Sequence, residues 1–129
     1  MTGLRDIYKC SICGHVVEIA GEGQPTLTCC NKLMDKLEAK TEDQGLEKHV
    51  PVFEDSAECN GHCIRVKVGS VEHPMQEDHY IKFIEVLTKD KVCRAELKPG
   101  QKPEAHFCLK KEDIVEVREY CTLHGLWKA

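Results

Sequence analysis

Short runs of alternating apolar and polar residues cover the last two-thirds of the chain, and turn-forming residues interrupt them at intervals of about ten positions. The clearest run is 64–68, where apolar residues fall at every second position, as in a half-buried β-strand. Similar runs occupy 50–53, 81–85 and 114–120, and no sustained helical period or internal repeat appears. The pattern predicts an all-β antiparallel sandwich.

Turn residues mark the connections between these runs. Asn60-Gly61 lies between the first two runs, and this dipeptide tolerates the positive φ that a tight hairpin turn requires. The segment 98–103, rich in Pro and Gly, breaks the chain again. The final run, 114–120, leads directly into Cys121, which we expect in a loop.

The first third of the chain has a different character. Residues 1–37 are too few to build a core, and small domains of this length commonly fold around a metal ion, because binding supplies free energy that burial cannot. Residues 35–45 are charged and apolar-poor, which indicates a surface connection. We therefore expect a small metal-bound domain over 1–37 and the sandwich over 38–129. The cysteines of the small domain are Cys10, Cys13, Cys29 and Cys30.

Composition narrows the classes of function. The chain has 129 residues and a net charge of −4, with no basic run for nucleic acid or for an anionic membrane. Residues 1–9 are charged and contain no signal-peptide core, and no apolar segment approaches the ~20 residues of a membrane span. The nine cysteines are then expected to be thiols and metal ligands in a reducing, cytoplasmic compartment.

Four histidines and one cysteine in three small clusters form the main candidate site. Five such ligands are one more than a tetrahedral zinc site accepts, so they indicate an octahedral metal, iron, with one open position for a small molecule. Pro74 favours an extended backbone before it, so we expect the ring of His73 to project freely from a loop. The candidate ligands are His49, His73, His79, Cys121 and His124.

Two flanking residues have a bearing on this site. The two-residue spacer between Cys121 and His124 suits ligands from one tight turn, and Gly125 can supply an unusual backbone angle there. Lys48 precedes a candidate ligand, and its charge would attract an anionic substrate to a chain that is otherwise negative. A solvated surface lysine is the alternative.

Several strings in this chain resemble those of the desulfoferrodoxin family, the two-iron form of superoxide reductase. They are EKHVP, HPMQEDHYI, LKPGQKPEA and REYCTLHGLWK, and the resemblance covers nearly the whole chain. It implies a desulforedoxin-like domain followed by an immunoglobulin-like, neelaredoxin-like catalytic domain. It also implies that the four histidines hold iron in one plane with Cys121 below, and that the reaction is reduction of superoxide to hydrogen peroxide.

The resemblance implies further roles and partners. Glu47 would close on the open position as a sixth ligand in the resting ferric enzyme, beside the catalytic Lys48. A homodimer and a small electron donor such as rubredoxin are also implied. Tyr120, next to Cys121, could tune the thiolate by packing or hydrogen bonding.

The four-cysteine set fits tetrahedral iron or zinc equally well on ligand type alone. The adjacent Cys29 and Cys30 must bend the backbone for both sulfurs to face one ion, so we expect a distorted tetrahedron. The family resemblance implies iron at this centre. We expect a structural role, with electron relay as the alternative.

Four cysteines and three histidines remain outside these sets. Cys59 and Cys63 flank the predicted turn, where thiols are expected and a third metal site with His62 is the alternative. Cys93 and Cys108 are equally distant from the turn at 99–102, a register that would allow a bridge between paired strands, although a reducing cytoplasm argues against it. No metal is expected at His15, His62 or His106.

The leading hypothesis is a superoxide reductase with two iron centres. The first alternative is an iron protein for electron transfer or redox sensing without turnover, for which the open position has no use. The second is a structural zinc protein, which accounts for the four cysteines and leaves the five-ligand set without a role.

Overall fold

A computed structural model describes residues 3–23, 26–42, 48–56, 63–69 and 73–129. It is almost entirely β, as predicted, and the helical element in this part of the chain is one 3₁₀ turn, η2 (Lys111–Asp113). Contacts divide the chain into two compact units, Met1–Glu38 and Ala39–Ala129. Over the described residues, no helix has the length and apolar character needed to cross a membrane.

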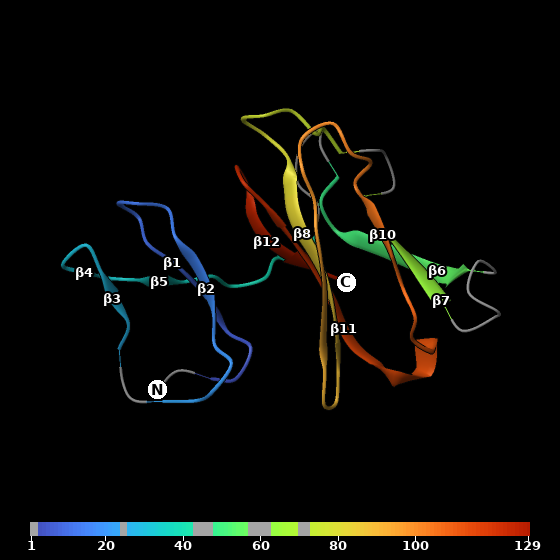
Figure 1. Ribbon diagram of the computed structural model, residues 1–129, viewed down its shortest axis with the longest axis horizontal. Coiled ribbons are helices and arrows are strands. Elements are labelled where there is room, and N and C mark those ends of the chain that lie inside the picture. The colour runs from blue at the N-terminus through green and yellow to red at the C-terminus, as the bar shows by residue number, and fades with distance from the viewer. Residues whose placement is uncertain (1–2, 24–25, 43–47, 57–62, 70–72) are drawn as a thin grey trace. The chain divides into compact units, whose positions relative to one another are not determined.

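The first unit is a small arrangement of short strands (Figure 1). A three-stranded antiparallel sheet has the order β2-β1-β5, and β3 pairs with β4 as a separate hairpin. Its buried apolar side chains include Ile7 and Ile19, too little for an independent core. The bounds are β1 (Ile7–Lys9), β2 (Val16–Glu18), β3 (Thr28–Cys29), β4 (Lys32–Leu33) and β5 (Asp35–Lys36).

Strand β5 corrects one expectation. Residues 35–36 were predicted to belong to a surface connection because they are charged, but they pair with Tyr8 and Lys9 at the edge of the first sheet. An edge strand tolerates charged side chains, since both of its faces need not be buried.

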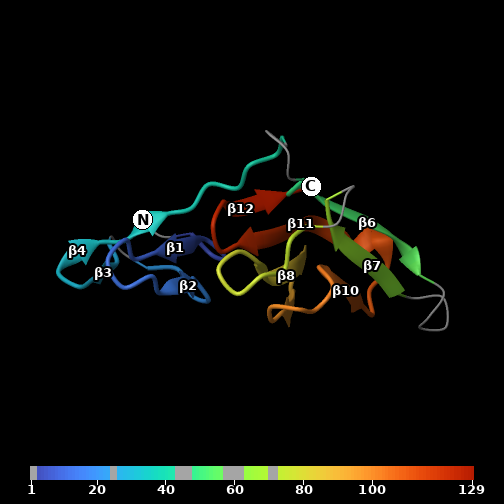
Figure 2. The ribbon, with the colours of Figure 1, turned by 90° about the horizontal axis from the view of Figure 1, so that it is seen from above.

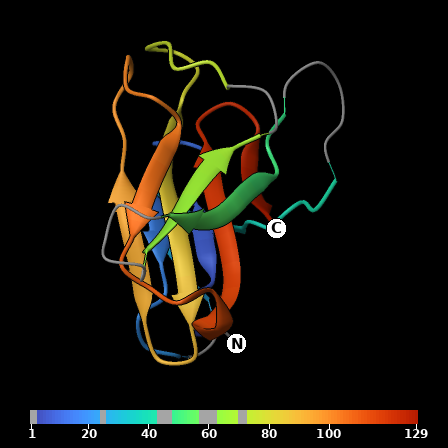
Figure 3. The ribbon, with the colours of Figure 1, turned by 90° about the vertical axis from the view of Figure 1, so that its right-hand side faces the viewer.

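The second unit is a sandwich of two antiparallel sheets (Figure 2). One sheet has the order β10-β7-β6 and the other the order β12-β11-β8-β9. Figure 3 shows the green strands β6 and β7 crossing in front of the yellow β8. The bounds are β6 (Pro51–Ser56), β7 (Cys63–Val68), β8 (Ile81–Thr88), β9 (Val92–Glu96), β10 (Glu104–Phe107), β11 (Ile114–Cys121) and β12 (Gly125–Lys128).

The core of the sandwich lies between the two sheets. Ile64, Val66 and Val68 of β7 are fully buried and form one cluster with apolar residues of β8 and β11, among them Val86 and Val117. Burying each such side chain contributes about 1.5–3 kcal/mol. The alternation along 64–68 therefore predicted both the strand and its inward face.

The two strands of the predicted hairpin are present. β6 and β7 pair antiparallel from Pro51 with Val68 to Ser56 with Cys63. The Asn60-Gly61 turn itself lies outside the described residues.

Three connections that carry candidate ligands meet at one end of the sandwich. His49 lies two residues before β6, the segment 73–80 precedes β8, and residues 122–124 join β11 to β12. Cys121, at the end of β11, pairs with Ile81 at the start of β8, so these two ligand segments are neighbours. The antiparallel topology thus brings distant parts of the sequence together.

Two candidate metal centres

The first group consists of four cysteine sulfurs in the small unit, all within 4.8 Å of one another. The Sγ atoms of Cys13 and Cys29 are 3.5 Å apart, and those of Cys29 and Cys30 are 3.9 Å apart. Sulfurs bound at about 2.3 Å to one tetrahedral ion lie about 3.8 Å apart. The spacing fits a tetrahedral metal. The four residues are Cys10, Cys13, Cys29 and Cys30.

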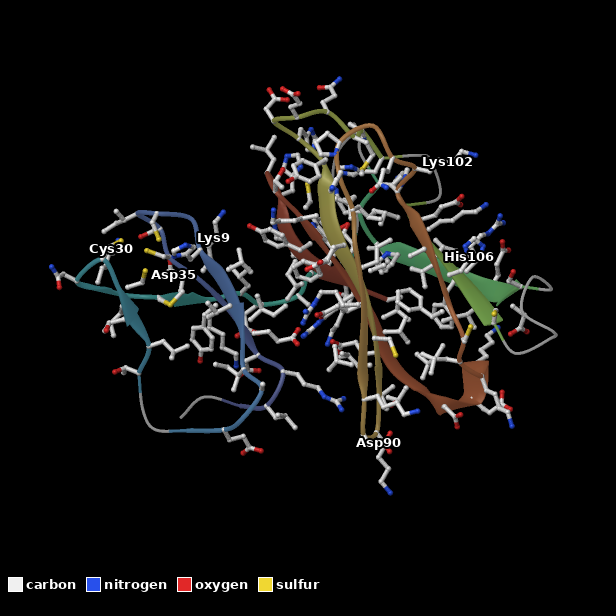
Figure 4. The ribbon with its side chains drawn as sticks, in the orientation of Figure 1. Lys9, Cys30, Asp35, Asp90, Lys102 and His106 are labelled. Carbon is white, nitrogen blue, oxygen red and sulfur yellow. The ribbon has the colours of Figure 1, made fainter. Side chains whose placement is uncertain are left out.

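The backbone around the adjacent pair shows the bend expected from the sequence. Cys30 and Asn31 form the two-residue turn between β3 and β4, and Figure 4 marks Cys30 there. Their φ angles are 53° and 58°. Two successive positive angles are the signature of a type I′ hairpin turn, which brings both sulfurs to one side.

The first cysteine loop prepares a thiolate. Gly14 has a φ of 82° and donates its N–H to the carbonyl of Cys10 at 3.0 Å. The backbone N–H of Cys13, followed by that of Ile12, lowers the pKa of Cys10 to about 6. The hydrogen bond with the Cys13 side chain, followed by that with Cys10, raises the pKa of Cys29 to about 12. Without a metal, Cys10 therefore loses its proton at a much lower pH than Cys29 does.

An imidazole also reaches this group. The Nδ1 atom of His15 lies 3.3 Å from the Sγ atom of Cys13, and both side chains are exposed. No sequence motif connects His15 with the cysteines, and its place two residues after Cys13 is the one signal that points to the contact.

The second group contains four imidazoles arranged as a closed ring. Neighbouring ring centroids are 4.6 Å apart for His49 and His73, 4.9 Å for His73 and His79, 5.0 Å for His79 and His124, and 4.8 Å for His124 and His49. Each neighbouring pair meets edge to face. The donor atoms of His49, His73, His79 and Cys121 all lie within 4.8 Å of one another.

Particular nitrogens can be assigned to that centre. Nε2 of His49 and Nδ1 of His124 are 3.1 Å apart. Two nitrogens bound at right angles to one ion, each at about 2.1 Å, would be about 3.0 Å apart. The donor atoms therefore fit a single metal ion.

Cys121 is the fifth candidate ligand of this group, and it is the one whose side chain lies in the core of the sandwich. Its side chain is fully buried, and its Sγ atom lies 3.6 Å from Nε2 of His73 and 3.9 Å from Nδ1 of His124. The strand register shifts between Tyr120 and Cys121, where β11 leaves the regular ladder with β8. Cys121 also belongs to the buried core cluster of the sandwich.

His73 differs from what the sequence predicted. It lies in a loop, but its side chain is 2% exposed, so the ring does not project freely. Its Nδ1–H donates to the carbonyl oxygen of Pro74 at 2.7 Å. This bond leaves Nε2, which is 3.6 Å from Sγ of Cys121, as the unprotonated nitrogen that a metal ligand needs.

The turn after Cys121 is held by the strand next to it. The N–H of Tyr80 donates to Oγ1 of Thr122 at 3.2 Å, and the N–H of Thr122 donates to the carbonyl of Tyr80 at 3.0 Å. Gly125 has a φ of 87°, and a Cβ there would meet no atom within 4 Å, so conformation and not space favours glycine.

Trp127 is a neighbour of the site that sequence reasoning missed. Its ring stacks on that of His49 with centroids 4.6 Å apart and planes 13° from parallel. It is the single tryptophan of the chain and lies three residues after His124, a signal that could have drawn attention to it.

The remaining predicted residues have different outcomes. Lys48 directly precedes His49 and is half-buried. Glu47 lies outside the described residues. Tyr120 is 3% exposed and stacks on Phe83 at 5.6 Å, so it packs beside the cysteine that follows it.

The cysteines outside both groups correct the expectation of a thiol at Cys63 and answer the question left open for Cys93 and Cys108. Cys63 is disulfide-bonded and is not a thiol, while Cys59 lies outside the described residues. Cys93 and Cys108 form no bridge with each other. Cys93 pairs with Val86 in one sheet, whereas Cys108 follows β10 in the other and lies 3.6 Å from the sulfur of Cys63. Equal distance from a turn did not make the two strands partners.

An all-β chain with a four-cysteine group and a histidine and cysteine group belongs to the class of non-haem iron proteins with two metal centres. The model of the desulfoferrodoxin family matches residues 41–129, and that of the desulfoferrodoxin N-terminal domain matches residues 2–37. The chain belongs to the desulfoferrodoxin family. Its two donor groups match the two iron sites of that family.

Named relatives cover the chain from end to end. A desulfoferrodoxin homolog of Archaeoglobus fulgidus is 47% identical over 100% of this chain and 99% of its own. The desulfoferrodoxin of Nitratidesulfovibrio vulgaris is 48% identical over 100% of this chain and 98% of its own. The crystal structure of the superoxide reductase from Treponema pallidum has a TM-score of 0.77 and 28% identity, and the match covers 96% of both chains.

Proposed function

We propose that this chain is a superoxide reductase, an oxidoreductase that adds one electron and two protons to superoxide to give hydrogen peroxide. The observation that carries the proposal is the closed ring of four imidazoles above the buried sulfur of Cys121. Five donors leave one position of an octahedral ion for a substrate. The likeness to the superoxide reductase of Treponema pallidum supports the same activity.

In this proposal the four histidines and Cys121 have different roles at the iron. His49, His73, His79 and His124 would hold the ion together with Cys121, and iron would supply the one-electron chemistry. The thiolate of Cys121 would donate electron density to the iron and stabilise its oxidised form, which would favour reduction of the substrate. Burial of the sulfur in the core keeps competing ligands away from it.

Lys48 and Glu47 are proposed to act on the substrate and the product of the reaction. Lys48 adds a positive charge beside His49 on a chain whose net charge is −4. It attracts the anion and holds a proton-donating water near it. Glu47 would bind at the centre in the resting enzyme and help to expel the product.

The other assignments follow the family. Residues 1–37 would form the desulforedoxin-like domain, with a structural iron at its four cysteines, and residues 38–129 the catalytic domain. Electron relay through the four-cysteine iron is a further role for the small domain. We propose a cytoplasmic homodimer that is re-reduced by a small carrier such as rubredoxin.

The test measures the stoichiometry of the products formed from superoxide. Iron-loaded protein, reduced without oxygen, is exposed to a pulse of superoxide, and both hydrogen peroxide and dioxygen are measured. We expect peroxide without dioxygen, and one iron oxidised for each peroxide formed. Dioxygen in the proportion of a dismutase would overturn the assignment.

A control variant and a second outcome sharpen this test. Cys93→Ser removes a cysteine outside both metal groups and should react like the wild type. If superoxide leaves the reduced iron unchanged while a reduced carrier still exchanges electrons with it, the protein is an electron-transfer protein instead.

A further inference from the structure

Lys40 is tied by its backbone to the edge of the sheet that carries two candidate ligands. Its N–H donates to the carbonyl of Leu126 at 2.9 Å, and its own carbonyl accepts the N–H of Lys128 at 2.9 Å. These bonds form a parallel bridge between Lys40 and Trp127 beside β12. The backbone of Lys40 therefore has a fixed place within the second unit.

The side chain of Lys40 contacts the segment that follows Cys121. Its Nζ donates to the carbonyl oxygen of His124 at 3.0 Å, although the two residues are 84 positions apart. A bond from an ammonium group to a carbonyl is charge-assisted and therefore stronger than a bond between neutral groups. It fixes the peptide that carries one imidazole of the ring.

The same ammonium group also lies over an aromatic ring. Nζ of Lys40 is 4.9 Å from the centroid of Trp127, within the range of a cation–π contact. The ring of Trp127 in turn stacks on His49. An ammonium group has three N–H bonds, so one can serve the carbonyl while the charge faces the ring.

We propose that Lys40 is a positioning residue of the histidine and cysteine centre. Its ammonium group restrains His124 through the bond to the backbone carbonyl, and it restrains His49 through the ring of Trp127. One side chain therefore links two imidazoles that lie near opposite ends of the second unit in sequence. The proposal rests on the ligands assigned above, and it requires nothing of superoxide chemistry.

The variant Lys40→Met tests this role, because it keeps the aliphatic stem and the backbone bonds but removes the ammonium group. We expect iron to leave the centre for a chelator about tenfold faster, the lower end of the effect seen when groups that orient metal ligands are removed. The visible absorption from the thiolate and iron should shift, since two imidazoles lose a restraint.

Two further variants separate positioning from general support. Lys40→Arg keeps a charged donor and should restore most of the wild-type iron retention. Lys128→Met is the matched control, because Lys128 lies next to the same edge and its Nζ pairs with Glu116 at 3.5 Å, away from both imidazoles. It should leave iron retention and the spectrum unchanged.

The outcomes are distinct. If Lys40→Met lowers the unfolding midpoint of the metal-free protein but leaves the chelator rate and the spectrum at wild-type values, Lys40 only secures the sheet edge and the proposal is overturned. A chelator rate equal for Lys40→Met and Lys128→Met would overturn it as well. Neither measurement uses superoxide, so a failed activity assay would count against the proposed reaction and not against this role.

Discussion

Arg118 donates a hydrogen bond of 2.6 Å from Nε to the carboxylate of Glu85, across the pair of strands β11 and β8. Glu85 is fully buried and Arg118 is 5% exposed. Arg94 of β9 donates to the second carboxylate oxygen at 2.8 Å. Three neighbouring strands are thus joined by one carboxylate with a cation on either side.

Removing Glu85 should strongly destabilise the fold. Glu85→Ala leaves the buried Arg118 without its counter-ion, and breaking a buried pair in this way costs about 3–5 kcal/mol. Urea unfolding at equal metal content measures the loss. Glu54→Ala breaks the exposed pair with Arg65 and should have little effect. Equal midpoints for the two variants would show that the buried pair adds nothing.

Lys48→Ile should slow the encounter with superoxide. The lysine is the charge beside His49, and losing it should lower the second-order rate constant at low salt by about tenfold or more. The iron spectrum should be unchanged, because no ligand is altered. Lys91→Ile, at the exposed turn between β8 and β9, is the control. A rate constant that matches that control at low salt would remove Lys48 from substrate capture.

Cys121→Ser should abolish the charge-transfer absorption between thiolate and iron that belongs to the histidine and cysteine centre, while the absorption of the four-cysteine iron stays. The hydroxyl of serine is a poorer electron donor, so the reduced ion should also become harder to oxidise. Visible spectroscopy and a redox titration of the iron-loaded variant measure both effects. The Cys93→Ser spectrum is the reference. Retention of the band in Cys121→Ser would place the thiolate ligand elsewhere.

His15→Ala should lower the reduction potential of the four-cysteine iron. The Nδ1–H of His15 can donate to the sulfur of Cys13, and such bonds withdraw electron density from the thiolate and favour the reduced ion. Potentiometry of the small centre measures the shift. His106→Ala, an exposed histidine on β10 marked in Figure 4, should leave the potential unchanged, and an equal shift there would contradict the bond.

Metal binding at the four cysteines should strengthen as the pH rises. Cys29 has a pKa of about 12 and that of Cys30 is also raised, so both hold protons at neutral pH when no metal is bound. An ion must displace these two protons, and each contributes up to about a tenfold gain in apparent affinity per pH unit. Cys10, with a pKa of about 6, adds to the gain only below that pH. Competition titrations with Zn²⁺ and a chelator at several pH values measure the slope. Affinity independent of pH would refute proton release.

The sequence predicted those parts of the molecule that depend on local pattern or local backbone geometry. Alternation defined β7 and its buried face, and the adjacent Cys29 and Cys30 implied the bend that the positive φ of Cys30 provides. Burial of His73 could not be predicted, because neighbouring segments distant in sequence supply the cover.

Other features depend on which strands become neighbours. Cys93 and Cys108 are symmetric about a turn in the sequence, but β9 and β10 belong to different sheets. Trp127 reaches His49 only because three ligand segments meet at one end of the sandwich. Sequence patterns carry no signal for a side-chain stack between residues 78 positions apart (49 and 127).

The register shift at the end of β11 divides the histidine and cysteine centre into a stiff part and a compliant part. Cys121 is a residue of the strand itself, whereas all four histidines lie outside the strands. The sulfur is therefore anchored to the interior by the strand ladder, whereas each imidazole is held by side-chain and loop contacts, such as the bond of His73 to the carbonyl of Pro74. An ion of another radius would be met by small movements of the histidines, while the distance between sulfur and core stays the same. The sulfur is the fixed reference point of the site.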